Sequence, residues 1–107
     1  MSGVTHHRGM GEQMDVESLR RLIDDTVVSR YEVFSHADIP ALCESLGMPA
    51  PPPKMDPRTN QSFSKHERLT ASLVACGDED LPVIARTVLA SQPVTAIQTD
   101  FFGRLLR

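Results

Sequence analysis

Apolar and polar residues recur along most of this chain with the period of an α-helix. The stretch 80–90 is the clearest case, because its apolar residues stand at i, i+3, i+4, i+7 and i+8. Asp78 to Asp80 place carboxylates at the positive end of the helix dipole, and Pro82 falls in the first turn, where its missing N–H costs nothing. The sequence therefore predicts a helix over 80–90 that packs onto the core through Leu81, Ile84, Ala85, Val88 and Leu89.

The first half of the chain predicts two further helices and a loop. Apolar residues keep helical spacing from Val16 to Tyr31, with Asp15 as the expected N-cap, so the first helix should end within 30–33. A second helix then begins, either with Ser35 and Asp38 as a capping box or with Asp38 itself as the cap and Pro40 in the first turn. It runs to Leu46 and stops at Gly47. Residues 48–63 are rich in proline and are expected to form a long surface loop.

The second half predicts a hairpin of two helices and a final helix. Ser64 and Glu67 form a capping box, and a helix opened by it should end before Gly77. That helix and the helix 80–90 are expected to form a tight αα-hairpin. After the break at Gln92-Pro93, a fifth helix is predicted from Val94, Ile97, Phe101 and Leu105, with Phe102 and Leu106 on an adjoining apolar strip.

The composition favours one small soluble domain. The chain has 107 residues, and 11 basic against 14 acidic side chains give a net charge of -3, which does not favour phosphate-dominated binding. No apolar run approaches the ~20 residues of a membrane span, so we expect a cytoplasmic protein with no membrane contact. Residues 1–14 are expected to be a disordered tail ahead of a single domain, 15–107, an all-α compact bundle of about five short helices.

Residues capable of chemistry are few and are not spaced for a site. Cys43 and Cys76 lie within amphipathic patterns, which favours buried free thiols over a disulfide or a nucleophile. The two cysteines do not form a C-x-x-C pair, and His36 and His66 do not form an H-x-x-x-H pair, so no spacing pre-arranges metal ligands. We therefore expect no catalytic residue, no metal and no cofactor.

Two surfaces are candidates for binding a protein partner. On the first predicted helix, Arg20 and Arg21 stand four residues before Asp24 and Asp25, which favours a solvated face with i, i+4 pairs and leaves a charged docking surface as the alternative. The last helix is unusually apolar for a chain end. The candidate partner surface therefore comprises Arg20, Arg21, Phe101, Phe102, Leu105 and Leu106.

Nucleic-acid binding is the alternative function. The predicted hairpin resembles a helix-turn-helix, in which the helix 80–90 would read the bases. Its acidic start would repel a duplex, so nucleic acid is an unlikely partner on this pattern. A basic cluster keeps the alternative open, with Lys54, Arg58, Lys65 and Arg68 as its candidate contacts.

Several segments after Leu19 carry a resemblance to a known family. They are SRYEVF at 29–34, Asp38-Ile39-Pro40 to Leu46-Gly47-Met48-Pro49, Ser64-Lys65 with Glu67-Arg68-Leu69, Asp78 to Ala85, and Ala96-Ile97-Gln98. In these segments the chain resembles the small helical N-terminal domains of bacterial abortive-infection (AbiJ-type) proteins.

The resemblance implies an adaptor or sensing module, similar to death-like effector-associated domains, with no catalytic residues to transfer. It implies a protein partner, which would be an effector domain, a homotypic domain or a second copy. No effector domain follows Arg107, so an excised domain, a stand-alone adaptor and a decoy remain open. The expected function is therefore non-catalytic protein–protein interaction in bacterial antiphage or stress defence.

Overall fold

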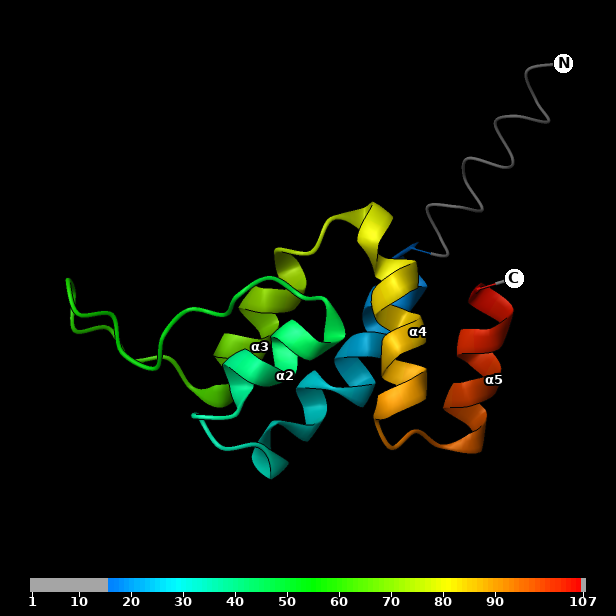
Figure 1. The fold of residues 1–107 in the computed structure, drawn as a ribbon, viewed down its shortest axis with the longest axis horizontal. Coiled ribbons are helices and arrows are strands. Elements are labelled where there is room, and N and C mark those ends of the chain that lie inside the picture. The colour runs from blue at the N-terminus through cyan, green and yellow to red at the C-terminus, as the bar shows by residue number, and fades with distance from the viewer. Residues whose placement is uncertain (1–15, 107) are drawn as a thin grey trace, which may run out of the picture.

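The structure is a computed structural model that describes residues 16–106. Within them the chain is all-α, as predicted, with helical segments packed around one core (Figure 1). The elements are a helix at 16–26, the 3-10 helix η1 (Val28–Val33), α2 (Ile39–Leu46), α3 (Lys65–Val74), the 3-10 helix η2 (Asp78–Asp80), α4 (Leu81–Ser91) and α5 (Ala96–Leu105). The predicted tail Met1–Met14 and the predicted N-cap Asp15 lie outside the described residues.

The first helix ends earlier than predicted. Its α-helical part stops at residue 26, and the chain continues as η1 with a kink at Arg30 (φ -97°, ψ 22°). Thr26, Val27 and Val28 are β-branched, and the Thr26 hydroxyl donates to the carbonyl of Leu22 at 2.7 Å. Both features weaken an α-helix, because β-branched side chains lose χ1 freedom and the hydroxyl competes for a helical carbonyl. The prediction of one α-helix to residues 30–33 is therefore wrong in its last turn.

The sequence signals for the start of α2, at Ser35, and for its end, at Gly47, both act in the structure. Gly47 adopts the left-handed conformation (φ 83°) and donates its N–H to the carbonyl of Glu44 at 3.1 Å, as the predicted stop requires. Ser35 accepts the N–H of Asp38 at 3.2 Å, whereas the side chain of Asp38 makes no capping hydrogen bond. Ser35 is thus the residue that satisfies the start of this helix.

α3 begins with the predicted capping box but does not form the predicted tight hairpin with α4. Ser64 accepts the N–H of Glu67 at 3.0 Å, and the Glu67 carboxylate accepts the N–H of Ser64 at 2.8 Å. The helix is capped at Ala75, and Gly77 is extended (φ -71°, ψ 146°) and leads into η2. α3 packs on η1 and α2, whereas α4 packs on α2 and α5. The two helices therefore pack mainly on different neighbours.

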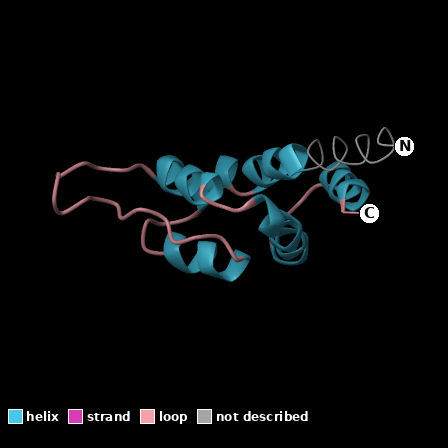
Figure 2. Cartoon of the chain, turned by 90° about the horizontal axis from the view of Figure 1, so that it is seen from above, coloured by secondary structure: helices cyan, strands magenta, loops and turns pink. Residues whose placement is uncertain are grey.

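α4 occupies the predicted place in the core. It carries Pro82 in its first turn and buries the predicted stripe, with Leu89 half-buried at the edge. Figure 2 shows the helices from above, arranged in layers, with a long loop extending to one side. The buried apolar residues of the core are Leu19, Ile23, Val27, Val28, Ile39, Cys43, Leu46, Met48, Leu69, Leu73, Cys76, Leu81, Ile84, Ala85, Val88 and Phe102.

Of the two apolar strips predicted for α5, the one that contains Phe102 is buried most deeply. Phe102 is fully buried, whereas Ile97 is 71% exposed and Phe101 is 46% exposed. Thr95 and Gln98 form a second capping box, and the T-x-x-Q pattern that encodes it is present in the sequence. The two apolar strips of this helix adjoin each other, and packing on α4 decides between them.

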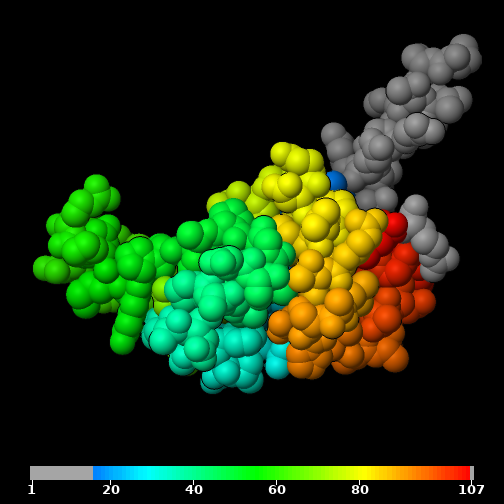
Figure 3. All heavy atoms as spheres, viewed as in Figure 1, coloured from blue at the N-terminus to red at the C-terminus, as the bar shows by residue number. Residues whose placement is uncertain are grey.

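The proline-rich segment is a loop, as predicted, and most of it projects from the bundle as an arm. We call residues 51–63 the arm; none of them is buried (Figures 1 and 3). Its two limbs are joined by the bridge between Met55 and Ser62 and by a hydrogen bond from the Phe63 N–H to the Lys54 carbonyl at 2.8 Å. The arm is therefore a short ribbon that is not part of the core.

Candidate functional site

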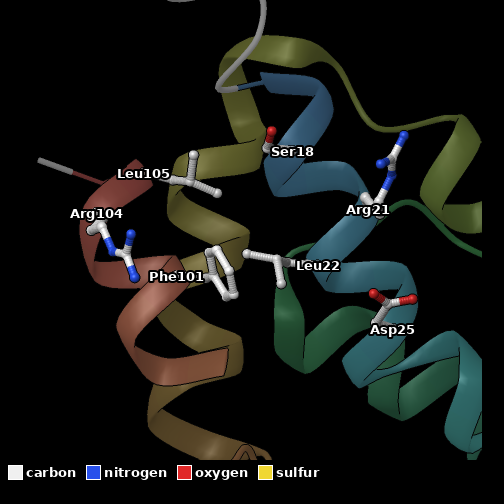
Figure 4. A pocket seen from close by; sticks show the side chains of 7 residues that line it. All are labelled: Ser18, Arg21, Leu22, Asp25, Phe101, Arg104 and Leu105. Carbon is white, nitrogen blue, oxygen red and sulfur yellow. The ribbon is translucent and has the colours of Figure 1, made fainter. Parts of the chain in front are cut away.

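An open groove runs between the helix 16–26 and α5. Its volume is about 470 Å³, and Figure 4 shows Leu22 and Phe101 facing each other across it. The lining residues are Ser18, Arg21, Leu22, Asp25, Phe101, Arg104 and Leu105. Apolar side chains from both helices thus form its floor, and charged side chains stand at its sides.

The groove follows from the helical register of its two walls. On the first helix the lining residues stand at 18, 21, 22 and 25, a stripe beside the buried stripe of Leu19 and Ile23. On α5 they stand at 101, 104 and 105, next to the buried Phe102. Because Phe102 fixes α5 on the core, Phe101 and Leu105 are left toward the groove. The spacing i, i+3, i+4, i+7 of the first wall was readable in the sequence as a second stripe.

Of the charged side chains that line the groove, Arg104 forms an ion pair, whereas Arg21 and Asp25 do not within residues 16–106. Arg104 pairs with Asp100 one turn earlier and lies over the ring of Phe101, with its guanidinium carbon 5.1 Å from the ring centroid. Arg21 and Asp25 form no ion pair with any residue in 16–106, so the predicted pair between them is not made. Arg21 therefore has an exposed guanidinium without an ion-pair partner in residues 16–106, although Figure 4 shows this group directed away from Phe101.

Arg20 has a structural role in place of the predicted surface role. Its guanidinium donates to the carbonyls of Leu73 (2.6 Å) and Cys76 (3.2 Å) and to the carboxylate of Asp78 (3.0 Å). These carbonyls lie at the C-terminal end of α3, where helical carbonyls lack partners within the helix. Arg20 therefore holds the end of α3 and does not pair with Asp24.

The structure divides the six residues of the candidate partner surface. Arg21, Phe101 and Leu105 line the groove. Phe102 is fully buried, so its assignment to an exposed surface is wrong for this structure. Leu106 packs partly buried against the core, and Arg20 is engaged as described. Ser18, Leu22, Asp25 and Arg104 join the surface instead.

Arg68 is likewise removed from the candidate nucleic-acid contacts. It is 5% exposed, and it donates to the carbonyls of Pro52 and His36, both at 2.8 Å. Its Nη1 also lies 3.1 Å from Nδ1 of His36. Because a guanidinium only donates, Nδ1 must accept this hydrogen bond, which requires an unprotonated Nδ1. Arg68 thus joins the start of the arm to the turn before α2.

The other three basic candidates remain accessible at the arm and its base. Lys54 and Arg58 are exposed, and Lys65 is half-exposed in the first turn of α3. Partial burial lowers the pKa of His36, and the positive charges of Lys54, Arg68 and Lys65 lower it further. The base of the arm therefore carries a positive potential.

The two thiols are buried and unreactive in character. Cys43 and Cys76 are free, as predicted, and burial raises the pKa of both. Cys76 donates its S–H to the carbonyl of Ser72 at 3.4 Å. Among residues 16–106, no group of three or more His, Cys, Asp or Glu side chains is placed to hold a metal ion.

Comparison with known proteins gives no relative from which a role can be transferred. No family model, no curated protein and no solved structure matches the chain. No helix in the described part of the chain is long and apolar enough to cross a membrane.

Proposed function

We propose that this domain is a non-catalytic protein–protein interaction module that binds an amphipathic helix of another protein in the groove. The observation that carries the proposal is the exposed apolar floor. Phe101 is 46% exposed, and Leu22 and Leu105 are half-buried beside it. Covering such side chains contributes about 1.5–3 kcal/mol for each one that passes from full exposure to burial, so partial burial here contributes less than this.

The shape and charge of the groove favour a helix with acidic flanks. Its walls are two helices, and a third helix laid between them would place apolar residues at i, i+3 or i+4, and i+7 on the floor. Arg21 stands on one wall and Arg104 on the other, and Asp25 is the one carboxylate in the lining. A partner helix with carboxylates beside its apolar stripe would pair with both guanidinium groups.

The absence of reactive groups around this groove supports a binding role over an enzymatic one. The lining contains neither histidine nor cysteine, and Asp25 is its one carboxylate. General acid–base or nucleophilic catalysis would require at least two cooperating groups within hydrogen-bonding reach. We therefore propose no catalytic residue and no cofactor.

The resemblance to AbiJ-type N-terminal domains supplies the cellular context of the proposal. On that basis the partner is an effector domain or a homotypic domain in cytoplasmic antiphage or stress defence. A helix-turn-helix role for α4 is less favoured, because α3 and α4 pack mainly on different neighbours and Asp78 to Asp80 are exposed at the start of α4.

Photo-cross-linking from the groove tests this function. A photoreactive residue placed at Ser18 should form adducts with one defined protein in the native cell. Phe101→Asp should remove these adducts, because it places a charge on the apolar floor. Ile97→Asp is the matched control, since Ile97 is exposed on the same helix and does not line the groove.

The outcome separates the partners. Adducts with a different protein support the proposal, and adducts with a second copy would identify a homotypic contact. If no adduct forms, or if Phe101→Asp and Ile97→Asp behave alike, the groove is not a docking site.

A further inference from the structure

The arm has an ordered fold although it contributes nothing to the core. Besides the bridge between Met55 and Ser62, the Asp56 N–H donates to the Gln61 carbonyl and the Asn60 N–H donates to the Asp56 carbonyl, both at 2.8 Å. Asn60 adopts a left-handed conformation (φ 59°) to close the turn. Ordering a segment costs conformational entropy, so an ordered ribbon without buried residues needs a reason outside the core.

The bundle holds the arm in a fixed direction. Arg68 donates to the Pro52 carbonyl at 2.8 Å, and the Ser72 hydroxyl donates to the Pro49 carbonyl at 2.5 Å. Both donors lie on one face of α3 and are buried. These hydrogen bonds restrain the direction in which the arm leaves the bundle, and Figure 3 shows it projecting to one side. Fixing it in advance reduces the entropy that a binding partner would have to supply.

The tip of the arm presents hydrogen-bonding side chains to solvent. Arg58, Thr59, Asn60 and Gln61 are all exposed. The turn uses the hydroxyl of Thr59, which accepts the Gln61 N–H at 3.2 Å. The side-chain amides of Asn60 and Gln61 form no hydrogen bond with residues 16–106. A guanidinium and two free amides are the groups that bind base edges with two hydrogen bonds each, Arg to guanine and Asn or Gln to adenine.

The base of the arm adds cations where a phosphate backbone would pass. Lys54 lies on the first limb, and Lys65 opens α3 immediately after the second limb. The nearby carboxylates of Asp56 and Glu67 each accept a backbone N–H, at 2.9 and 2.8 Å. The exposed acidic residues of η2 lie away from the arm, above α4 in Figure 1. Within residues 51–68 the four basic side chains Lys54, Arg58, Lys65 and Arg68 outnumber the carboxylates of Asp56 and Glu67, so the local charge is positive although the net charge of the chain is -3.

We propose that the arm binds duplex DNA, with the ribbon in the major groove and Lys54 and Lys65 on the flanking phosphates. The major groove of B-form DNA admits a two-stranded ribbon, whereas that of A-form RNA is too narrow. An acidic protein surface would use the cations alone and would leave the amides of Asn60 and Gln61 without a role. This inference is independent of the groove between the helix 16–26 and α5.

Fluorescence anisotropy with a labelled, sequence-randomised DNA duplex tests the arm in the full chain. Two phosphate contacts predict that affinity falls roughly tenfold between about 50 and 200 mM salt. Lys54→Ala should halve the slope of log affinity against log salt, because one contact is lost. Arg58→Ala should weaken binding by roughly tenfold while the slope stays nearly unchanged. Arg86→Ala is the matched control, because Arg86 is exposed on α4 away from the arm.

Three results would overturn the proposal. One is no binding at low salt, including the case in which polyglutamate binds and DNA does not. Another is equal loss in the arm variants and in Arg86→Ala. The third is binding of an RNA duplex of the same sequences as tightly as DNA. Lys54 and Arg58 are exposed, so their variants are expected to keep the wild-type circular dichroism spectrum.

Discussion

Two regions of the domain, the buried core around α4 and the partly buried base of the arm, are stabilised by different interactions. Around α4 the contacts are apolar, and Ile84 and Val88 have at most 1% of their surface exposed. At the base of the arm a single guanidinium, that of Arg68, binds two carbonyls and one imidazole. Apolar packing is shared among many side chains, whereas most of the hydrogen bonds that hold the arm come from Arg68, with one more from Ser72. The two regions should therefore respond differently to mutation.

Ile84→Asp should have the largest effect, because it places an unpaired carboxylate in the core. The cost is expected to exceed about 4 kcal/mol, which is close to the whole stability of a small domain. Circular dichroism should show loss of helix. Val83→Asp is the control, because Val83, the residue directly before Ile84, is 62% exposed. The Val83→Asp protein should stay folded. A folded Ile84→Asp protein would contradict the central role of α4.

Arg68→Ala should cost about 2–4 kcal/mol, because it removes a buried guanidinium and leaves two partly buried carbonyls without their donor. Urea unfolding measures the loss, and limited proteolysis should cut within 51–63 faster than in the wild type. Arg58→Ala, at an exposed arginine of the same arm, should change the free energy of unfolding by less than about 0.5 kcal/mol. Equal effects of the two variants would show that Arg68 does not hold the arm.

Arg20→Ala should cost about 1–2 kcal/mol, which is less than Arg68→Ala because Arg20 is more exposed. Most of this cost should come from the hydrogen bonds that Arg20 donates to the carbonyls of Leu73 and Cys76. Asp78→Ala removes only an exposed ion-pair partner and should therefore cost less than about 1 kcal/mol. Arg21→Ala should leave the free energy of unfolding within about 0.5 kcal/mol. Denaturant midpoints of the three variants give the order directly.

Acidification should weaken the base of the arm by a small amount. The pKa of His36 in the folded protein is below its ordinary value of 6.5. Its contribution to stability is therefore complete above pH 6.5 and is lost as the pH falls through the lowered folded pKa. The backbone N–H of Ser64 lowers the pKa of Glu67 below 4.5, so a second loss begins only below that pH. Between pH 6.5 and pH 4.5 the free energy of unfolding should depend less on pH in His36→Gln than in the wild type. An unchanged dependence would show that His36 is not its source.

The sequence could predict the features that depend on neighbouring residues, but not the hydrogen bonds between segments that are distant along the chain. The stripe of α4, the stop at Gly47 and the capping box of Ser64 and Glu67 depend on residues within a few positions, and each is confirmed. Arg20 and Arg68 bind carbonyls of segments distant along the chain, and no local pattern distinguishes them from exposed arginines. Both were therefore predicted as surface residues.

The apolar strips of α5 fall between these cases. Spacing alone allowed the stripe of Phe101 as well as the stripe of Phe102, and the contact with α4 selects the second. The groove depends on this choice, since burial of Phe102 leaves Phe101 exposed and Leu105 half-buried beside Leu22. Its position could be derived only after the helices had been placed.

The two buried thiols make local opening of the domain measurable without any added probe. Cys43 lies in α2 and Cys76 follows α3 beside the carbonyls bound by Arg20, and both are at most 6% exposed. A thiol reagent can reach them only in transiently opened molecules, so each labelling rate reports the population of one open state. Because the contacts of Arg20 surround the end of α3, its loss should accelerate the labelling of Cys76 more than that of Cys43.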